Sequence, residues 1–229
     1  GQPRRLSLQS SAQQNPGTPD VSVVIVLFNQ AGLSRQAFSA LADQTEVTFE
    51  TIVVDNASSD STPQLLDRLD GVTVIRNATN VGFLHAANQG ARVAQGRHIV
   101  FLNNDAILHP HALRQGVRRL DGCATIGAVG GRIVLADGSL QEAGCTAYRT
   151  GSTAGYGRGK DPHAAAFCFV RDVDFCSGAF LMVRKDLWQR LGGFDPAYAP
   201  AYYEDTDLCL RIQDAGFRVV YDPSIWLTH

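Results

Sequence analysis

The stretch VSVVIVLF, residues 21–28, is a nearly unbroken run of apolar, mostly β-branched residues. A short run of this kind is typical of a strand buried on both faces, as strands of parallel sheets are. Comparable runs alternate along the chain with segments of helical periodicity: strands are expected at 51–55, 72–77 and 98–102, and helices near 33–41, 63–69, 85–94 and 110–120. This alternation predicts an α/β fold with a Rossmann-like, mostly parallel central sheet flanked by helices.

The composition excludes several classes of protein. A chain of 229 residues with 45% hydrophobic and 18% charged residues is not disordered, and no apolar run approaches the ~20 residues of a transmembrane segment. The formal charge of -2 argues against a nucleic-acid partner. The five cysteines form no CxxC or CxH pair, which argues against a zinc site or a disulfide framework and favours a reduced, cytoplasmic setting.

The two ends of the chain differ from its middle. Residues 1–20 are rich in Gln, Ser and Pro, so we expect a linker or disordered arm there, followed by one folded domain over 21–229. The glycine-rich segment 146–166 is expected to be a flexible loop, and a helix at 204–215 and a strand at 218–221 close the pattern. We expect the chain to be a domain excised from a longer protein.

Polar residues stand directly after three of the expected strands. They are Asn29, Asp55 and the run Asn103–Asp105. Ligands of open α/β sheets bind outside the carboxyl ends of the strands, so the site is expected at this edge. Asp55 is either the cap of an Asx-turn or an acceptor for a nucleotide base or ribose. No GxGxxG follows the first strand, which argues against a dinucleotide-binding oxidoreductase.

The sequence HIVFLNNDAILHP, residues 98–110, carries one carboxylate, that of Asp105, at the end of a buried strand. One interpretation is a cap for the helix that follows. The other is a site for Mg²⁺ or Mn²⁺, because hard cations prefer oxygen ligands and Mg²⁺ commonly takes one or two carboxylates together with substrate phosphates.

A second acidic cluster lies in YYEDTDLCLR, residues 202–211, where Glu204, Asp205 and Asp207 occupy the first turn of an expected helix. Complementing the helix dipole, at about 0.3–1 kcal/mol for each acid, accounts for one or two of them. A carboxylate at a helix start is also well placed to act as a general base. His229 ends the sequence as either a structural histidine or a metal ligand.

Four pieces of the sequence together resemble the family 2 glycosyltransferases with a GT-A type fold. They are VSVVIVLFN, ETIVVDNASSDST, NVGFLHAANQGARVAQGRHIVFLNNDAILHP, and the stretch from DFCSGAFLMV to IWLTH. The likeness covers residues 21–229 and is greatest to the bacterial members that build O-antigen and other surface polysaccharides. It implies a nucleotide-sugar-binding half at 21–122 and a smaller acceptor and catalytic half at 123–229.

The resemblance implies roles for individual residues. Asp205 matches the catalytic base and Glu204 a residue that positions the sugar or acceptor, while Asp105 and His229 match metal ligands for Mg²⁺ or Mn²⁺. Residues that match the family's nucleotide and substrate contacts are Leu27, Phe28, Asn29, Asp55, Asn80, Gly82, Asn103, Asn104, Ser177 and Gly178. The first acid of the family's DxD motif is replaced here by Asn103. Arg158, in the glycine-rich segment, is expected to close over the diphosphate.

The implied activity is an inverting, metal-dependent transfer of a sugar from a nucleotide-diphosphate sugar, with UDP or dTDP as the nucleotide. The acceptor is a hydroxyl of a saccharide or a lipid-linked saccharide, and the setting is cytoplasmic, at the inner face of the membrane, with peripheral attachment through the rest of the protein. Two alternatives stay open at this point: a sugar nucleotidyltransferase, and a non-catalytic domain that binds sugar nucleotides or acts as a scaffold.

Overall fold

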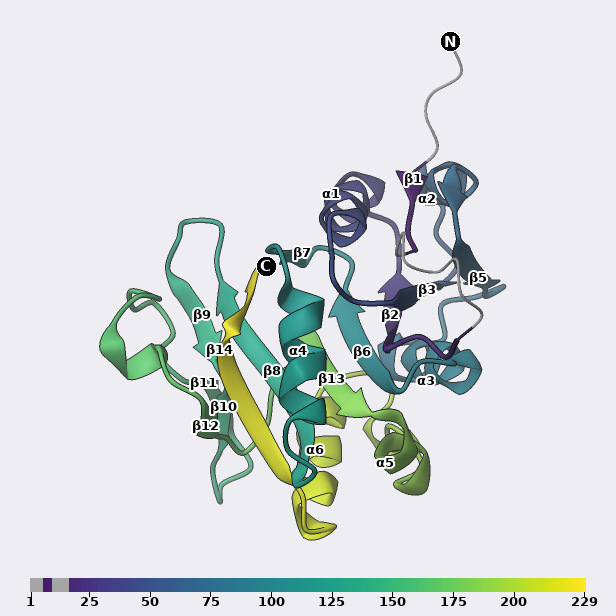
Figure 1. Ribbon diagram of the computed structural model, residues 1–229. Helices are drawn as coiled ribbons and strands as arrows, with labels where there is room; N and C mark the ends of the chain where they lie inside the picture. The colour runs from purple at the N-terminus through teal and green to yellow at the C-terminus, as the bar shows by residue number, and fades with distance from the viewer. Residues whose placement is uncertain (1–5, 10–16) are drawn as a thin grey trace.

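The computed structural model describes residues 6–9 and 17–229 (Figure 1). Within them, ten strands form one sheet in the order β12-β14-β8-β13-β6-β2-β3-β5, with β7 paired to β14 and β9 paired to β8. The strands of this sheet are β2 (Val21–Leu27), β3 (Phe49–Asp55), β5 (Val72–Arg76), β6 (His98–Asn103), β7 (Ile107–Leu108), β8 (Ile126–Val134), β9 (Leu140–Ala143), β12 (Arg171–Asp172), β13 (Phe180–Arg184) and β14 (Arg218–Thr228). Two small two-stranded sheets pair β1 (Leu6–Ser7) with β4 (Leu69–Asp70) and β10 (Cys145–Ala147) with β11 (Thr153–Gly155).

Helices cover both faces of the sheet. They are α1 (Ala31–Ala42), α2 (Thr62–Leu66), α3 (Phe83–Val93), α4 (Ala112–Asp121), α5 (Lys185–Arg190) and α6 (Glu204–Asp214), with short 3₁₀ turns η1 (Ala165–Phe167) and η2 (Pro196–Tyr198). Residues of α1, α2 and α4 belong to one core cluster, and residues of α3, α5 and α6 belong to another. None of the described helices has the length and apolarity needed to span a membrane.

The parallel half of the sheet confirms the predicted α/β class. Strands β5, β3, β2 and β6 pair in parallel. Successive side chains of a strand point to opposite faces. Val23 and Ile25 therefore enter the core under α1, whereas Val24 enters the core under α3. Because both faces are covered, β2 needs an apolar residue at nearly every position, which is what the sequence of 21–27 provides.

The C-terminal half of the sheet is mixed rather than parallel. Strand β13 lies antiparallel between β6 and β8, while β8 and β14 are parallel to each other. The chain passes from β8 to β13 through the short strands β9 to β12 instead of a crossover helix. An apolar run such as FLMV satisfies a buried central position in either direction, so the sequence pattern alone does not fix this orientation.

The last strand is longer than the 218–221 expected from the sequence. Its register with β8 shifts between Asp222 and Trp226, and this irregularity accommodates Pro223, after which pairing resumes. At the end of the strand, Thr228 lies opposite both Val134 of β8 and Ile107 of β7. Strand β14 therefore delivers the final residue of the chain to the edge where β6 ends.

Part of the expected N-terminal arm belongs to the fold. Leu6 and Ser7 pair with β4, and Leu8 is fully buried, with its carbonyl accepting a hydrogen bond from Thr51 Oγ1. The expectation that the fold begins at Val21 is therefore wrong for 6–9. Two leucines in a polar segment supply enough apolar surface to anchor it. Residues 1–5 and 10–16 lie outside the described part of the chain.

The segment 146–166, expected to be a flexible loop, carries regular structure. Its start forms the β10–β11 hairpin, and its middle is bonded to β9: Ala143 N donates to Tyr156 O, and Leu140 N donates to Lys160 O. These backbone hydrogen bonds hold the segment beside the sheet. The glycines of this segment allow tight turns, because Gly151, Gly157 and Gly159 all adopt a positive φ that other residues seldom adopt.

Candidate active site

A cleft runs along the carboxyl ends of β2, β3 and β6 and consists of three neighbouring cavities. The Phe28 cavity, of about 410 Å³, includes Phe28, Asn56, Asn80 and Asn104 in its walls. The central cavity, of about 390 Å³, is lined by residues that include Asn103, Gln141, Ser177, Gly178 and His229. The Tyr203 cavity, of about 340 Å³, includes Thr153, Phe175 and Tyr203.

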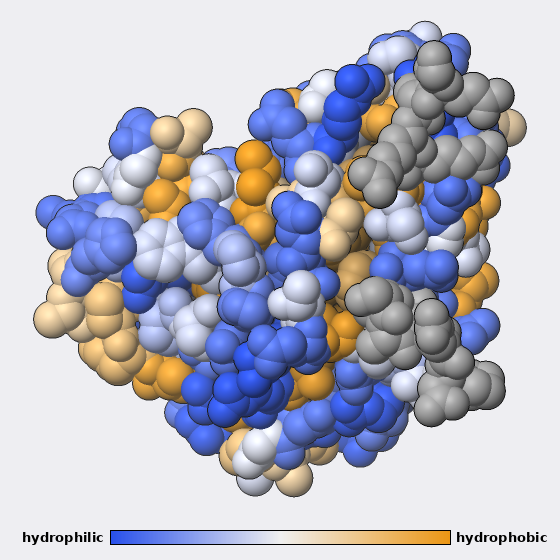
Figure 2. All heavy atoms as spheres, turned by 45° about the horizontal axis from the view of Figure 1, so that its top comes forward, coloured by the Kyte–Doolittle hydropathy of each residue, from blue (hydrophilic) through white to orange (hydrophobic). Residues whose placement is uncertain are grey.

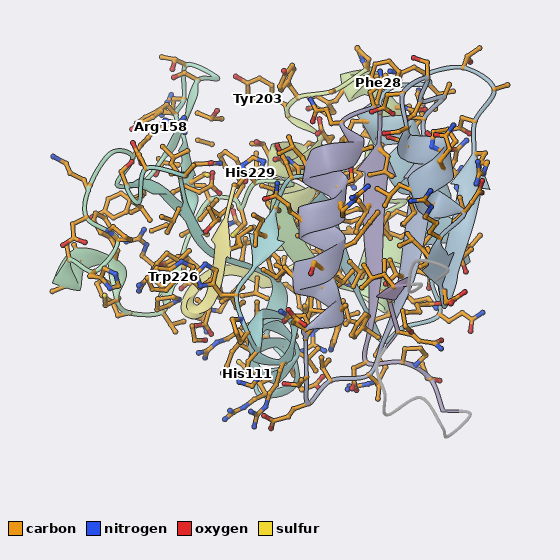
Figure 3. All side chains as sticks on the ribbon, turned by 90° about the horizontal axis from the view of Figure 1, so that it is seen from above. Phe28, His111, Arg158, Tyr203, Trp226 and His229 are labelled. Carbon is orange, nitrogen blue, oxygen red and sulfur yellow. The ribbon has the colours of Figure 1, made fainter. Side chains whose placement is uncertain are left out.

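Shared walls make these cavities one continuous cleft. Phe83 and Ala201 line both the Phe28 cavity and the central cavity. Tyr202, Glu204 and Asp205 line both the central cavity and the Tyr203 cavity. Figure 2 shows the upper edge of the molecule hollowed between its two halves. Seen from above, Tyr203 and His229 lie between Phe28 and Arg158 (Figure 3).

The Phe28 cavity has an aromatic wall and walls of side-chain amides. The Phe28 ring is half exposed at the end of β2. Asn56 Nδ2 donates to Asn80 Oδ1 at 2.7 Å, and Asn77 Nδ2 donates to Asn56 Oδ1 at 3.1 Å. Asn80 Oδ1 also accepts from Gly82 N. The network therefore fixes the wall of the cavity as a set of neutral hydrogen-bonding groups.

Three residues expected to contact a nucleotide line none of these cavities. Leu27 is fully buried in the core. Asn29 Oδ1 accepts from Ser59 N at 2.8 Å and so connects two loops. Asp55 is 4% exposed, and its Oδ1 accepts from Ser58 N at 3.0 Å, which is the turn-capping role that the sequence had left open. The structure instead places Asn56, the next residue, in the cavity wall.

Gly82 is required by the backbone at the start of α3. Its φ of 83° and ψ of 159° lie in a region that is essentially restricted to glycine. A Cβ at this position would also lie 2.8 Å from Pro200 O. This close approach joins the start of α3 to the loop that precedes α6, which is how the Phe28 cavity and the central cavity come to share a wall.

Asp105 and His229 meet although 124 positions separate them in the sequence. His229 Nε2 lies 3.2 Å from Asp105 Oδ1 and 3.0 Å from Asn103 Nδ2, and His229 Nδ1 lies 3.1 Å from Gln141 Oε1. The amide oxygen of Gln141 accepts a hydrogen bond from Nδ1–H, which leaves the Nε2 lone pair directed at Asn103 and Asp105. Without a metal ion, a proton on Nε2 would instead be shared with Asp105 Oδ1, and this hydrogen bond is what lowers the pKa of Asp105, against the opposing effect of burial.

The donor set of this pair fits a small divalent cation. Two ligands at adjacent corners of an octahedron with bonds of 2.0–2.1 Å lie about 3 Å apart, close to the 3.2 Å between Asp105 Oδ1 and His229 Nε2. Two acceptor atoms at this distance repel each other unless a proton or a metal ion lies between them. Within residues 6–9 and 17–229, no cluster of three or more His, Cys, Asp and Glu side chains offers a metal site. A metal ion held by this pair would therefore take its other ligands from groups other than His, Cys, Asp and Glu side chains of the described residues, such as a bound molecule or water.

Asp205 faces the same cavity from the first turn of α6. Its Oδ2 accepts from Gly178 N at 2.9 Å, and its Oδ1 accepts from Thr206 N at 2.6 Å. Burial raises the pKa of Asp205, and these hydrogen bonds oppose that shift. Burial also raises the pKa of Glu204, whose Oε2 is buried without a hydrogen-bond partner among the described residues. A bound ligand can supply the hydrogen-bond partner that the buried oxygen of Glu204 lacks, and the raised pKa of the neighbouring Asp205 is typical of a functional site.

Two residues of the central cavity had no sequence signal of their own. Gln141 and Glu142 belong to β9, which pairs antiparallel with β8. Glu142 is buried, its Oε1 lies 3.4 Å from Ser177 N, and burial raises its pKa. Both reach the cleft only because β9 folds back antiparallel against the end of β8, whose other edge pairs with the end of β14. Arg158, expected at a diphosphate, lines none of the three cavities.

Comparisons with known proteins agree with this geometry. The sequence pattern of glycosyl transferase family 2 matches residues 22–192. An uncharacterized protein of Sinorhizobium fredii is 31% identical over 93% of this chain and 24% of its own length, and an O-antigen biosynthesis protein of Myxococcus xanthus is 28% identical over 93% and 17%. An N-acetylglucosaminyl-diphospho-decaprenol L-rhamnosyltransferase of Mycobacterium tuberculosis is 26% identical over 93% and 76%. The chain thus spans a quarter or less of the first two relatives.

Two solved structures share the fold. One is a mannosyltransferase from Pyrobaculum calidifontis in complex with GDP-Man and Mn²⁺, with a TM-score of 0.66 and 19% identity over 93% of this chain and 57% of that one. The other is GalNAc-T7 with UDP, GalNAc and Mn²⁺, with a TM-score of 0.73 and 18% identity over 94% and 44%. Both are GT-A glycosyltransferases, which confirms the expected fold. With the family pattern matched over 22–192, the chain belongs to glycosyl transferase family 2.

Proposed function

We propose that this domain moves a sugar from a nucleotide-diphosphate sugar, with UDP or dTDP as the nucleotide, to a hydroxyl of a saccharide or lipid-linked saccharide, with inversion at the anomeric carbon. Family membership and the relatives named for O-antigen synthesis and rhamnosyl transfer support a role in bacterial surface polysaccharide synthesis. We place this activity in the cytoplasm, at the inner face of the membrane.

The observation that carries the proposal is the placement of two kinds of group around one cavity. The Asp105–His229 pair lies close to one wall of the central cavity, and Asp205 lies in another. In the proposed reaction Asp205 removes the proton of the acceptor hydroxyl as that oxygen attacks the anomeric carbon and the diphosphate leaves. The raised pKa of Asp205 makes it a stronger base than an exposed aspartate.

Asp105 and His229 would hold the divalent metal ion, Mg²⁺ or Mn²⁺. When bound, such an ion neutralises charge on a diphosphate leaving group. The chain's own contribution is to present one carboxylate and one imidazole nitrogen 3.2 Å apart, with Gln141 fixing the orientation of the ring. Mn²⁺ in both solved neighbours supports the assignment.

The Phe28 cavity is proposed to hold the nucleotide. The half-exposed Phe28 ring offers a face on which a base can stack, and the amides of Asn56 and Asn80 offer donors and acceptors to base and ribose. Glu204, with its unpaired buried oxygen, is proposed to accept a hydrogen bond from a sugar hydroxyl at the junction of the central and Tyr203 cavities.

The substitution Asp205→Asn tests the assignment of the base. Metal-dependent turnover of the donor is expected to fall by about 10²–10⁴-fold, because the amide cannot accept the proton. Binding of UDP or dTDP, measured by titration calorimetry, is expected to persist. Asp214→Asn, at the exposed end of the same helix, is the matched control and should behave as the unaltered protein.

Three readouts distinguish this proposal from the alternatives. Full turnover by the Asp205→Asn variant would remove Asp205 as the base. Retention of the anomeric configuration in the product, read by NMR, would contradict inversion. Release of pyrophosphate from a nucleoside triphosphate and a sugar phosphate would indicate a nucleotidyltransferase instead. A domain that binds nucleotide sugars but never consumes them, with any acceptor or with water, would be a binding module.

A further inference from the structure

A fourth cavity adjoins the Tyr203 cavity on the side away from the Asp105–His229 pair. We call it the tyrosine platform, because Tyr148, Tyr198 and Tyr203 line it together with Leu210. It shares Thr153, Tyr203 and Thr206 with the Tyr203 cavity, so it continues the cleft outward from Asp205. Its volume of about 180 Å³ corresponds to about six water molecules, which is of the order of one sugar ring.

The platform is assembled from three separate parts of the chain. Tyr148 follows β10 in the β10–β11 hairpin, Tyr198 ends η2, and Tyr203 immediately precedes α6. All three rings are exposed, at 53%, 37% and 44% respectively, and Leu210 is 41% exposed. Large apolar side chains gathered from distant segments into one exposed group mark a contact surface, whereas single exposed ones need no explanation.

Backbone strain next to the platform also needs a reason. Tyr202 and Tyr203 have φ values of 78° and 67°, a region that non-glycine residues seldom occupy. Such residues cost of order 1–3 kcal/mol each, and these two rings are too exposed to recover that energy by packing in the core. The strain sets where the two rings stand relative to Asp205, which follows Tyr203 by two residues.

The chemistry of the platform matches a saccharide better than a lipid chain. A tyrosine offers an aromatic face for the C–H side of a sugar ring and a hydroxyl for hydrogen bonding, at a low cost in conformational entropy. A wall for an acyl or prenyl chain would be aliphatic, yet Leu210 is the single aliphatic side chain larger than alanine among its lining residues. Among the described residues that line the platform none is Lys, Arg or His, and Arg211 beside it is paired with Asp207 at 2.6 Å, so the platform does not favour a phosphate.

We propose that the tyrosine platform is an acceptor subsite that holds the sugar ring next to the one whose hydroxyl reacts at Asp205. The acceptor is then an oligosaccharide of at least two rings. This inference rests on the proposed function, since it takes Asp205 as the point where the acceptor reacts. It narrows the acceptor class and assigns the exposed tyrosines a role in selecting acceptor length.

The test compares the unaltered protein with the double variant Tyr148→Ala/Tyr198→Ala. Phe169→Ala is the matched control, because Phe169 is as exposed as Tyr148, at 53%, but lines a different cavity. The probes are a printed array of bacterial surface oligosaccharides of one to four rings, followed by saturation-transfer NMR and calorimetry with the free glycans that bind. Circular dichroism and melting temperature establish that each variant is folded.

For the unaltered protein and for Phe169→Ala, we expect a glycan of two or more rings to bind at least about tenfold more tightly than its terminal monosaccharide. The double variant is expected to lose this length dependence, while its metal-dependent hydrolysis of the donor stays within twofold. Saturation transfer should reach the second ring in the unaltered protein and not in the double variant.

Several results would overturn the proposal. They are binding of monosaccharide and oligosaccharide with equal affinity, full length dependence in the double variant, and no binding by any glycan on the array. Binding to phosphatidylglycerol vesicles that the tyrosine substitutions abolish would assign the platform to a lipid surface, and a dimer that they dissociate would assign it to a second copy of the chain. Failure of the proposed function is seen separately, as absence of donor hydrolysis in the unaltered protein.

Discussion

The hydrogen bond from His229 to Gln141 predicts a specific loss of metal affinity. Gln141→Leu removes the acceptor for the Nδ1 proton, so the imidazole can rotate or change tautomer and no longer holds Nε2 toward Asp105. Loss of such an outer partner typically costs 10–100-fold in metal affinity. The His229 side chain is 20% exposed and that of Asp105 is 37% exposed, so water partly replaces the lost acceptor. We therefore expect the lower end, about tenfold or about 1.4 kcal/mol.

The assay is the dissociation constant of Mn²⁺ in the presence of saturating UDP, measured by electron paramagnetic resonance or calorimetry. Gln115→Leu is the control, since Gln115 is equally half-buried but lies on α4 and lines none of the four cavities of the cleft. Gln141→Glu keeps an acceptor for Nδ1 and adds a negative charge near the site, so it should bind Mn²⁺ at least as tightly as the unaltered protein. A Gln141→Leu variant that binds Mn²⁺ within twofold of the unaltered protein would refute the role of this hydrogen bond.

Three further predictions follow from the site. Burial raises the pKa of Glu142 in the folded state, so ionisation of this side chain opposes folding at pH values above the pKa that glutamate has in the unfolded chain. Glu142→Gln should therefore raise the melting temperature at pH 7 by about 2–4 °C. Calorimetry at pH 7 and in acid checks this, because the gain should vanish in acid. Gly82→Ala should lower the free energy of unfolding, measured in urea, by about 1–3 kcal/mol or more. Gly138→Ala, at a glycine with a similar φ but open space around it, should lower this free energy by less, because only Gly82→Ala brings a Cβ against Pro200. Equal losses of stability in the two variants would contradict this. The rate of transfer should fall as pH falls through the raised pKa of Asp205, and a pH-rate profile with its acidic limb at or below the ordinary aspartate value would exclude Asp205 as the base.

The sequence predicted the parallel half of the fold well because both of its faces are buried. Strands such as β2 and β3 then need apolar residues at almost every position, and a pattern of that kind is visible without tertiary information. The length of β14 was not visible in this way. Pro223 normally ends a strand, and only the irregularity between Asp222 and Trp226 in the pairing with β8 lets the strand continue.

The residues of the candidate site likewise fall into those that the local sequence predicts and those that depend on strand pairing. Residues that stand directly after strands or at a helix start, such as Asn103 and Asp205, could be placed at the cleft from their local sequence. Gln141 and Glu142 could not, because they reach the cleft through the pairing of β9 with β8, which is a property of the folded sheet. Asp55 was in the right turn, but its carboxylate caps that turn, and the adjacent Asn56 faces the cavity.

A single carboxylate at the end of β6 changes what a ligand has to supply. An acid in place of Asn103 would set a second negative charge within about 3 Å of the His229 ring and would attract a divalent cation even without substrate. With an amide there, the pair of Asp105 and a neutral imidazole carries one negative charge, too little to dehydrate and hold such an ion firmly. If the pair holds the proposed metal ion, the diphosphate of the donor would provide the missing charge, so we expect metal ion and donor each to raise the affinity for the other. In this proposal the donor completes the metal site of the central cavity, and the neutral amide of Asn103 disfavours its completion by a metal ion alone.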